Sequence, residues 1–404
     1  MAVIIAENCV FCQKIFACIK KKLYLCRKFS IMIQRQLQSL LQEKLHRGKA
    51  IILIGARQTG KTTLLKELVQ NSESTLWINA DDLEMRNLVQ GLTIAKLQSL
   101  FGAYKNVVID EAQRIENVGL QLKLITDNMP HLQLLVTGSS ALEIANTINE
   151  PLTGRKYEYK LYPLSFNELQ QHFGLIKEQM NLPLRLVYGS YPDVVCNPGE
   201  EKDILSQLAD SYLYKDVLQW ERVKKPDKLL KLLQALAYQM GSEVNYTELA
   251  QLVGLDKETI GNYIALLEQA QVVFRLGSFS RNLRNELKFA RKIYFYDNGI
   301  RNALISNYSD ISIRQDIGAL WENYLVSERV KYNQYNSRYV NKYFWRTAQM
   351  QEIDYLEESD GVLSAYEFKW NPKKSAKTNL TFRRAYPNVP IITITRDNYI
   401  DFLR

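Results

Sequence analysis

The chain has 404 residues, which is enough for two to four domains at about 100–200 residues each. Apolar residues make up 46% and charged residues 24%, ordinary values for a globular chain that exclude mostly disordered, collagen-like and low-complexity classes. No run approaches the roughly 20 apolar residues that a membrane helix needs, so we expect no membrane association. The net charge of +9 permits an anionic partner without requiring one.

The first 31 residues differ from the rest in charge and cysteine content. Residues 1–30 hold six basic side chains against one acidic side chain. A disulfide framework is excluded because only Cys196 follows this region. The cysteine spacing is poor for zinc, and the charges follow the apolar stretch instead of preceding it, unlike a secretory signal. We expect a basic, disordered extension, with Met32 as an alternative start. Its cysteines are Cys9, Cys12, Cys18 and Cys26.

The strongest motif is Gly55–Thr62, which matches the phosphate-loop pattern G-x-x-x-x-G-K-S/T. The apolar run Ala50–Ile54 predicts a buried strand before it, and Thr63–Val69 predicts a helix after it. The glycines let the backbone wrap phosphates, and the helix N-terminus faces the anion. We expect Lys61 to reach the outer phosphates and Thr62 to bind Mg²⁺. The predicted nucleotide-binding residues are Gly55, Gln58, Thr59, Gly60, Lys61, Thr62 and Thr63.

A second motif, Val107–Glu111, is an apolar strand that ends in two carboxylates. Downstream of a phosphate loop this pattern is typical of hydrolysis, with Asp110 holding magnesium and Glu111 polarising the attacking water. Strand-like runs alternate with helical segments, which predicts a parallel sheet with helices on both faces. The further runs are Thr75–Asn79, Leu132–Val136 and Tyr157–Leu161.

These features together resemble the AAA-plus branch of P-loop ATPases. The resemblance implies ATP and Mg²⁺ as cofactors, and Thr137 or Ser139 as a sensor of the γ-phosphate or the attacking water. The alternative is that Ser139 only caps the next helix. Leu152–Arg155 resembles a motif of a bacterial and archaeal subgroup, in which the arginine contacts the γ-phosphate, within one subunit or on a neighbouring one. Arg155 is otherwise a surface arginine. The implied catalytic set is Lys61, Glu111, Ser139 and Arg155.

The middle of the chain predicts helices and then a helix-turn-helix. Residues 163–225 are expected to form a lid or connector. Tyr246–Val253 predicts a short helix that closes at Gly254, and Asp256 caps another that runs to about residue 270. This arrangement resembles a helix-turn-helix.

Two expected strands, Val272–Leu276 and Lys292–Tyr296, flank a basic loop and would complete a winged helix. DNA binding would place Lys257–Tyr263 in the major groove and the basic loop on phosphates. The alternative is a protein contact, because Lys257 is the single basic residue of that recognition helix.

The C-terminal part contains Asp354 and, after a turn, Glu367-x-Lys369, the PD-(D/E)xK nuclease pattern. Carboxylates on adjacent strands bind magnesium, and the lysine lies on the same strand face as Glu367 because side chains alternate. Glu322, on the preceding helix, matches an extra acid that some members use. Ile353 stands where the motif has proline. The alternative is a nuclease-like fold that binds DNA or docks proteins without cleavage.

The order of these parts resembles a large family of prokaryotic ATPases related to the archaeal-type ATPases, with a C-terminal domain of unknown function. The resemblance implies an α/β fold with an AAA-type parallel sheet, a winged helix and a nuclease-like α/β domain. It further implies ATP hydrolysis, homo-oligomers and a DNA transaction such as binding, remodelling or branch processing, with or without cleavage. We expect a cytoplasmic location because the sequence shows no export or membrane signal and the activity needs ATP. The alternative function is a nucleotide-controlled switch whose C-terminal domains dock proteins. The expected domains are the extension (1–31), the ATPase core (32–162), the connector (163–225), the winged helix (226–298) and the nuclease-like domain (299–404).

Overall fold

The computed structural model describes residues 32–72, 74–138, 152–211, 225–280, 291–347, 349, 351–373 and 380–404. Residues 36–404 form one compact unit. The predicted extension over residues 1–31 lies outside the described residues, and so do Ser139 and most of the predicted basic loop.

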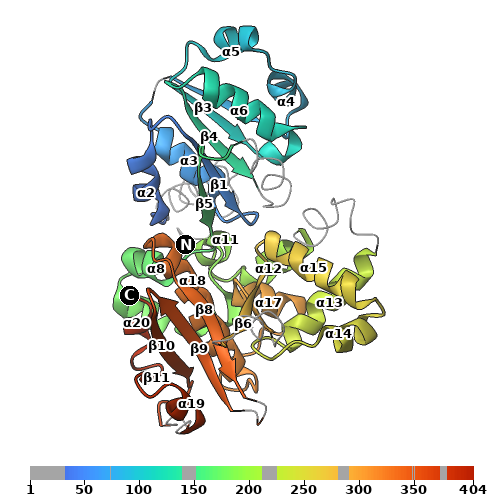
Figure 1. Ribbon diagram of the computed structural model, residues 1–404, viewed down its shortest axis with the longest axis vertical. Helices are drawn as coiled ribbons and strands as arrows, with labels where there is room; N and C mark the ends of the chain where they lie inside the picture. Colours follow the sequence, from blue (N-terminus) through green and yellow to red (C-terminus); the bar gives the residue numbers. More distant parts are fainter. Residues whose placement is uncertain are drawn as a thin grey trace, which may run out of the picture. The chain divides into compact units, whose positions relative to one another are not determined.

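The first sheet has five parallel strands in the order β2-β3-β4-β1-β5 (Figure 1). Its three central strands are buried along their whole length, which is why their sequences are near-continuous apolar runs. The strands are β1 (Ala50–Gly55), β2 (Thr75–Asn79), β3 (Asn106–Asp110), β4 (Gln133–Gly138) and β5 (Lys156–Leu161).

Helices cover both faces of this sheet because side chains alternate along each strand. Ile51 and Leu53 of β1 belong to one hydrophobic cluster, together with Leu64 of α3. Ile52 and Ile54 belong to another, which includes α5 and α6. The prediction of a parallel sheet with helices on both faces is confirmed. These helices are α2 (Leu37–Lys44), α3 (Lys61–Val69), α4 (Leu83–Val89), α5 (Ile94–Phe101), the 3₁₀ turn η1 (Ala112–Arg114) and α6 (Val118–Asn128).

The predicted connector is helical and is attached to the C-terminal part of the chain. Asn302 of α17 (Asn298–Leu304) donates from Nδ2 to the carbonyls of Leu186 and Val187, at 3.2 and 2.8 Å. Asp297 accepts a hydrogen bond of 2.7 Å from the backbone N–H of Ser190. All these groups are buried, so they fix the segment in place. Its helices are α8 (Phe166–Phe173), α9 (Leu175–Met180), α10 (Leu182–Tyr188), α11 (Pro192–Cys196) and α12 (Glu201–Ser211).

The two helices predicted after residue 240 are present, with the expected ends. Asn245 caps α14 through hydrogen bonds from the N–H groups of the first turn, and Gly254 ends it with a positive φ of 73°. Asp256 caps α15 in the same way. The helices of this module are α13 (Pro226–Tyr238), α14 (Tyr246–Val253) and α15 (Lys257–Gln269).

The second sheet has six strands in the order β11-β10-β9-β8-β6-β7. The hairpin of β6 and β7, expected as the wing of a separate domain, pairs through Gly277 and Ser278 with Tyr343 and Phe344 of β8. The domain boundary expected at residue 298 therefore separates β7 from β8, although both strands belong to one continuous sheet. The strands are β6 (Val273–Ser278), β7 (Arg291–Phe295), β8 (Asn341–Arg346), β9 (Glu352–Ser359), β10 (Val362–Phe368) and β11 (Ile391–Ile394).

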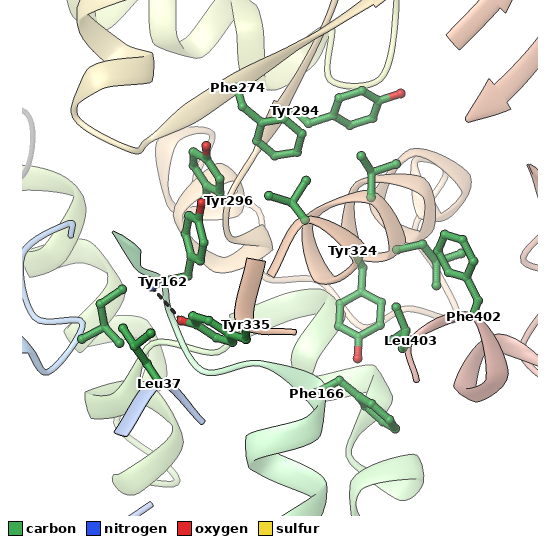
Figure 2. Packing of buried hydrophobic residues seen from close by; sticks show 14 of the residues in the cluster. Leu37, Tyr162, Phe166, Phe274, Tyr294, Tyr296, Tyr324, Tyr335, Phe402 and Leu403 are labelled. Carbon is green, nitrogen blue, oxygen red and sulfur yellow. Dashed lines mark hydrogen bonds between the residues drawn. The ribbon is translucent and has the colours of Figure 1, made fainter. Parts of the chain in front are cut away.

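Helix α18 (Ile317–Tyr335) is buried on nearly all sides, among the residues that Figure 2 shows. Tyr162 follows the last residue of β5, and its backbone N–H donates to the hydroxyl of Tyr335 at 3.0 Å. The Tyr162 ring also stacks on Tyr296, with the ring centroids 5.1 Å apart. The end of the first sheet is thereby joined to α18. Two short helices complete the chain, α19 (Leu380–Ala385) and α20 (Tyr399–Phe402).

No helix among the described residues is both long and apolar enough to cross a membrane.

Candidate nucleotide site and acidic cluster

The phosphate loop joins the end of β1 to the start of α3. A Cβ atom on Gly55 would lie 2.6 Å from the carbonyl oxygen of Leu161 in β5, so only glycine fits this close approach. Gly60 has a φ of 95° and forms the N-cap of α3. The backbone geometry therefore favours glycine at both glycine positions of the motif.

Two side chains of the loop bind the loop's own carbonyl groups. Lys61 is only 5% exposed, and its Nζ donates to the carbonyls of Gly55 and Ala56 at 2.8 and 3.0 Å. The hydroxyl of Thr59 donates to the carbonyl of Ala56 at 2.8 Å. The structure thus places a buried ammonium group beside the helix N-terminus, where N–H groups face an anion.

Asp110 lies at the end of β3 and accepts from two threonine hydroxyls. The Thr62 hydroxyl is 3.0 Å from Oδ2, and the Thr137 hydroxyl, at the end of β4, donates to Oδ1. Neighbouring ligands of an octahedral Mg²⁺ at about 2.0–2.1 Å lie about 2.9 Å apart, close to the separation of Thr62 and Asp110. Hydroxyl and carboxylate oxygens are also the ligands that this ion prefers, so Thr62 and Asp110 fit a magnesium site.

Glu111 has left-handed backbone angles, with φ 56° and ψ 42°. Such a conformation costs a non-glycine residue roughly 1–3 kcal/mol and persists only where its surroundings hold it. Here the Glu111 N–H donates to the Thr137 hydroxyl at 3.0 Å, and the Glu111 carboxylate accepts from Nε2 of Gln113. Thr137 therefore positions both acids. Gln113 was not identified from the sequence, although it lies only two residues after Glu111.

Arg155 lies at the opposite edge of the first sheet from the phosphate loop. Its carbonyl accepts from the N–H of Ala50, the first residue of β1, whereas the loop follows Gly55, the last residue. At about 3.3 Å per residue, some 16 Å of strand separates the two ends. The side chain forms an ion pair with Asp127 at the end of α6. Within one chain Arg155 therefore does not contact a nucleotide at this loop, which corrects the intramolecular version of the prediction.

The structure brings together Asp354, Glu367 and Lys369. The Lys369 Nζ lies 3.5 Å from Asp354 Oδ2 and 3.4 Å from Glu367 Oε2, and the N–H of Phe368 donates to Asp354 at 2.7 Å. Burial raises the pKa of Glu367, and the charge of Asp354 adds to this effect while Lys369 opposes it.

Glu322 of α18 has different partners. Its Oε1 accepts from the Tyr294 hydroxyl at 2.6 Å and lies 3.0 Å from Nζ of Lys292. Burial raises the pKa of Glu322, which Lys292 opposes and Asp354 reinforces. Within the described part of the chain, no group of three or more Asp, Glu, His or Cys side chains is arranged to hold a metal ion. Lys292 and Tyr294 were not identified from the sequence, where their signal was two polar positions alternating with apolar ones in a predicted strand.

The predicted recognition helix shows little positive charge. Over Lys257–Tyr263, the exposed side chains are Lys257, Glu258 and Asn262, whereas Tyr263 is buried. The two charges cancel. The structure therefore provides no basic surface on this segment.

Three segments of the chain match known family models. Residues 47–170 match a family model described as an AAA domain, which confirms the prediction of a P-loop domain of the AAA type. Residues 179–311 and 317–401 match two models described as domains of unknown function, DUF8612 and DUF4143.

Two relatives and one solved structure are also similar. An uncharacterized protein of Mycobacterium tuberculosis is 25% identical over 342 residues, covering 83% of this chain and 74% of that protein. An uncharacterized protein of Haemophilus influenzae is 28% identical over 312 residues, covering 69% of this chain and 76% of that protein. A Walker-type ATPase of Pyrococcus abyssi matches with a TM-score of 0.47 at 14% identity, covering 68% of this chain and 96% of that one.

Proposed function

We propose that this chain binds ATP at Gly55–Thr63, hydrolyses it with magnesium, and couples turnover to a DNA transaction. The observation that carries the ATPase proposal is the convergence of Lys61, Thr62, Asp110 and Glu111 at one edge of the first sheet. Each of these groups is fixed by a neighbour, as catalytic groups must be before the substrate arrives.

Each residue has a distinct task in this proposal. Lys61 exchanges its loop carbonyls for outer phosphate oxygens, and the loop N–H groups bind the remaining ones. Thr62 and Asp110 would hold Mg²⁺, which when bound neutralises phosphate charge. Glu111 orients the attacking water and accepts its proton. Thr137 holds the backbone of Glu111 and the carboxylate of Asp110 through its hydroxyl.

The decisive experiment is the steady-state ATPase rate of the purified protein, alone and with single-stranded, duplex and branched DNA. The Lys61→Ala variant provides the blank. A several-fold rise with one DNA form supports the coupling of ATP turnover to DNA and identifies the DNA substrate. No turnover above the blank in any condition contradicts the ATPase proposal itself.

The second candidate function is a nucleotide-controlled switch whose C-terminal domains dock proteins. The observation that favours it is the uncharged balance of the exposed residues in α15, Lys257, Glu258 and Asn262. Non-specific DNA affinity comes from basic side chains that neutralise phosphates, and this surface carries a single one, Lys257, beside the acidic Glu258. ATP turnover that is indifferent to all DNA forms, with no DNA retained in a shift assay, favours the switch.

Homo-oligomerisation is part of the proposal, because Arg155 reaches a nucleotide only if that nucleotide belongs to a neighbouring subunit. Mixing Arg155→Ala subunits with Glu111→Gln subunits then restores part of the ATPase activity, since each supplies what the other lacks. If no mixing ratio restores activity, Arg155 acts only through its ion pair with Asp127. Asp127→Ala, which removes that pair alone, is the matched control.

A further inference from the structure

Lys292 lies inside the acidic cluster of the second sheet. The side chain comes from β7 and is 2% exposed. Its Nζ is 3.0 Å from Oε1 of Glu322 and 2.5 Å from Oε1 of Glu352. One ammonium group therefore bridges an acid on a helix and an acid on a strand.

The surroundings of Lys292 hold it there. The aromatic ring of Phe344 lies 5.4 Å from the ammonium group, a favourable cation–π distance. Tyr294, two residues along β7 and so on the same side of the strand, donates its hydroxyl to the oxygen of Glu322 that faces Lys292. The Lys292 position is thus built from β7, β8 and α18 together.

Each acid of the cluster has a cationic partner within 4 Å without any ion. Lys292 pairs with Glu322 and Glu352, and Lys369 pairs with Asp354 and Glu367. Arg346 lies 3.6 Å from Glu352 and is also paired with Glu243. Buried carboxylates need such partners, because an unpaired buried charge is strongly destabilising. The ammonium group of Lys292 already contacts the carboxylate oxygens of Glu322 and Glu352. A divalent cation bound to the same oxygens would therefore lie in van der Waals contact with that ammonium group.

We propose that Lys292 is a built-in counter-cation that takes the place of a divalent metal in this cluster, so that the second sheet carries a nuclease-like set of acids without metal-dependent cleavage. At Glu322 and Glu352, where Lys292 occupies the carboxylate oxygens, the residues do not fit the metal that the PD-(D/E)xK resemblance implies. The acids instead bind the β6–β7 hairpin to α18. This proposal goes beyond ATP hydrolysis and does not depend on it.

Metal binding tests the proposal directly. The probe is Mn²⁺, titrated calorimetrically into the full-length chain, with Asp110→Asn in every variant to remove the carboxylate of the nucleotide site. Lys292→Met keeps the length of the side chain and removes the charge. We expect no saturable Mn²⁺ binding in the parent that retains Lys292. In Lys292→Met we expect one saturable site, at least tenfold tighter than any residual binding by the parent. A second change, Glu322→Gln, removes that site again.

Lys231→Met is the matched control, because Lys231 is exposed on α13, and it should behave as the parent. Folding of each variant is checked by circular dichroism. Folded Lys292→Met that binds no Mn²⁺ overturns the proposal, and so does a parent site that Glu322→Gln abolishes. If Lys292→Met does not fold, the test rests on Mn²⁺ binding by the parent alone. Metal-dependent DNA cleavage by the wild type that Asp354→Ala removes also overturns the proposal, whereas a folded parent without a site supports it.

Discussion

Both sheets of this protein present carboxylates, but what faces those carboxylates differs. At the first sheet, Asp110 faces the neutral hydroxyls of Thr62 and Thr137. At the second sheet, Glu322 and Glu352 face the ammonium group of Lys292. A hydroxyl has lone pairs and can bind a metal ion beside a carboxylate, whereas an ammonium group has none and repels a cation. The partners, more than the acids, therefore decide which site suits magnesium.

The largest expected effect comes from the same substitution made in the two acidic sites. Glu111→Gln should lower the ATPase rate by about 10²–10⁴-fold while ATP stays bound, because the amide cannot accept the proton of water. Glu322→Gln should leave the rate unchanged. Turnover is measured by phosphate release and binding by retention of labelled ATP. Unchanged turnover in Glu111→Gln would remove the catalytic assignment.

Lysine substitutions should give the next effect. Lys61→Ala should lower turnover by about 10²–10³-fold, since it removes the cation that stabilises the transferred phosphoryl group, and ATP affinity should weaken as well. Lys66→Ala, at an exposed position of the same helix, is the control and should retain the activity. Equal losses in both variants would show that α3 is merely destabilised.

Substitution of Thr137 tests whether the neutral hydroxyl that faces Asp110 matters for catalysis. Thr137→Val should lower kcat by about 10–100-fold, because Asp110 and Glu111 lose their shared positioning group. It should also cost about 1–3 kcal/mol of unfolding free energy, since the N–H of Glu111 is left unpaired. Thr137→Ser keeps the hydroxyl and should restore kcat. A loss of stability without any change in kcat would make Thr137 purely structural.

The smallest effects, on the order of 1 kcal/mol, concern two buried glutamates of the second sheet. Burial raises the pKa of Glu367 above 4.5, so its contribution to stability is present below the unfolded pKa and is lost as pH rises through the folded pKa. Glu357 has the opposite sign. Although burial acts to raise it, the hydrogen bonds and charge of Arg329 lower its pKa below 4.5. Its contribution is therefore present above the unfolded pKa and is lost as pH falls through the folded pKa.

Urea unfolding between pH 3 and pH 7 separates these two signs. Relative to the wild type, Glu367→Gln should remove a decline of unfolding free energy with rising pH. Glu357→Gln should be least stable relative to the wild type at the neutral end. Parallel pH profiles for the two variants would refute the assigned charge environments.

The sequence could predict what is local. The phosphate loop occupies consecutive residues between a strand and a helix, so a pattern there implies a geometry. The same holds for the helix end at Gly254 and the cap at Asp256. The parallel direction of the strands in the first sheet, though not their order, follows from the alternation of strands and helices. These features depend on neighbours in the chain.

Non-local pairing accounts for what could not be predicted. Nothing in the β6–β7 hairpin reveals that β8, some 45 residues further on, continues its sheet. The distance of Arg155 from the phosphate loop follows from its register with Ala50, which a motif does not encode. Lys292 meets Glu322 and Glu352 only after three separate segments have packed together.

The hydrogen bond between Tyr162 and Tyr335 has a consequence for how the two sheets influence each other. Tyr335 is the last residue of α18, and Glu322 lies thirteen residues earlier on the same helix. At 1.5 Å per residue, about 20 Å of rigid helix links the edge strand of the nucleotide sheet to the acidic cluster. When two ligands both shift the position of one helix, each ligand changes the affinity for the other by the same factor. If ATP displaces α18, a partner bound beside Glu322 must change ATP affinity by the same factor by which ATP changes the affinity of that partner.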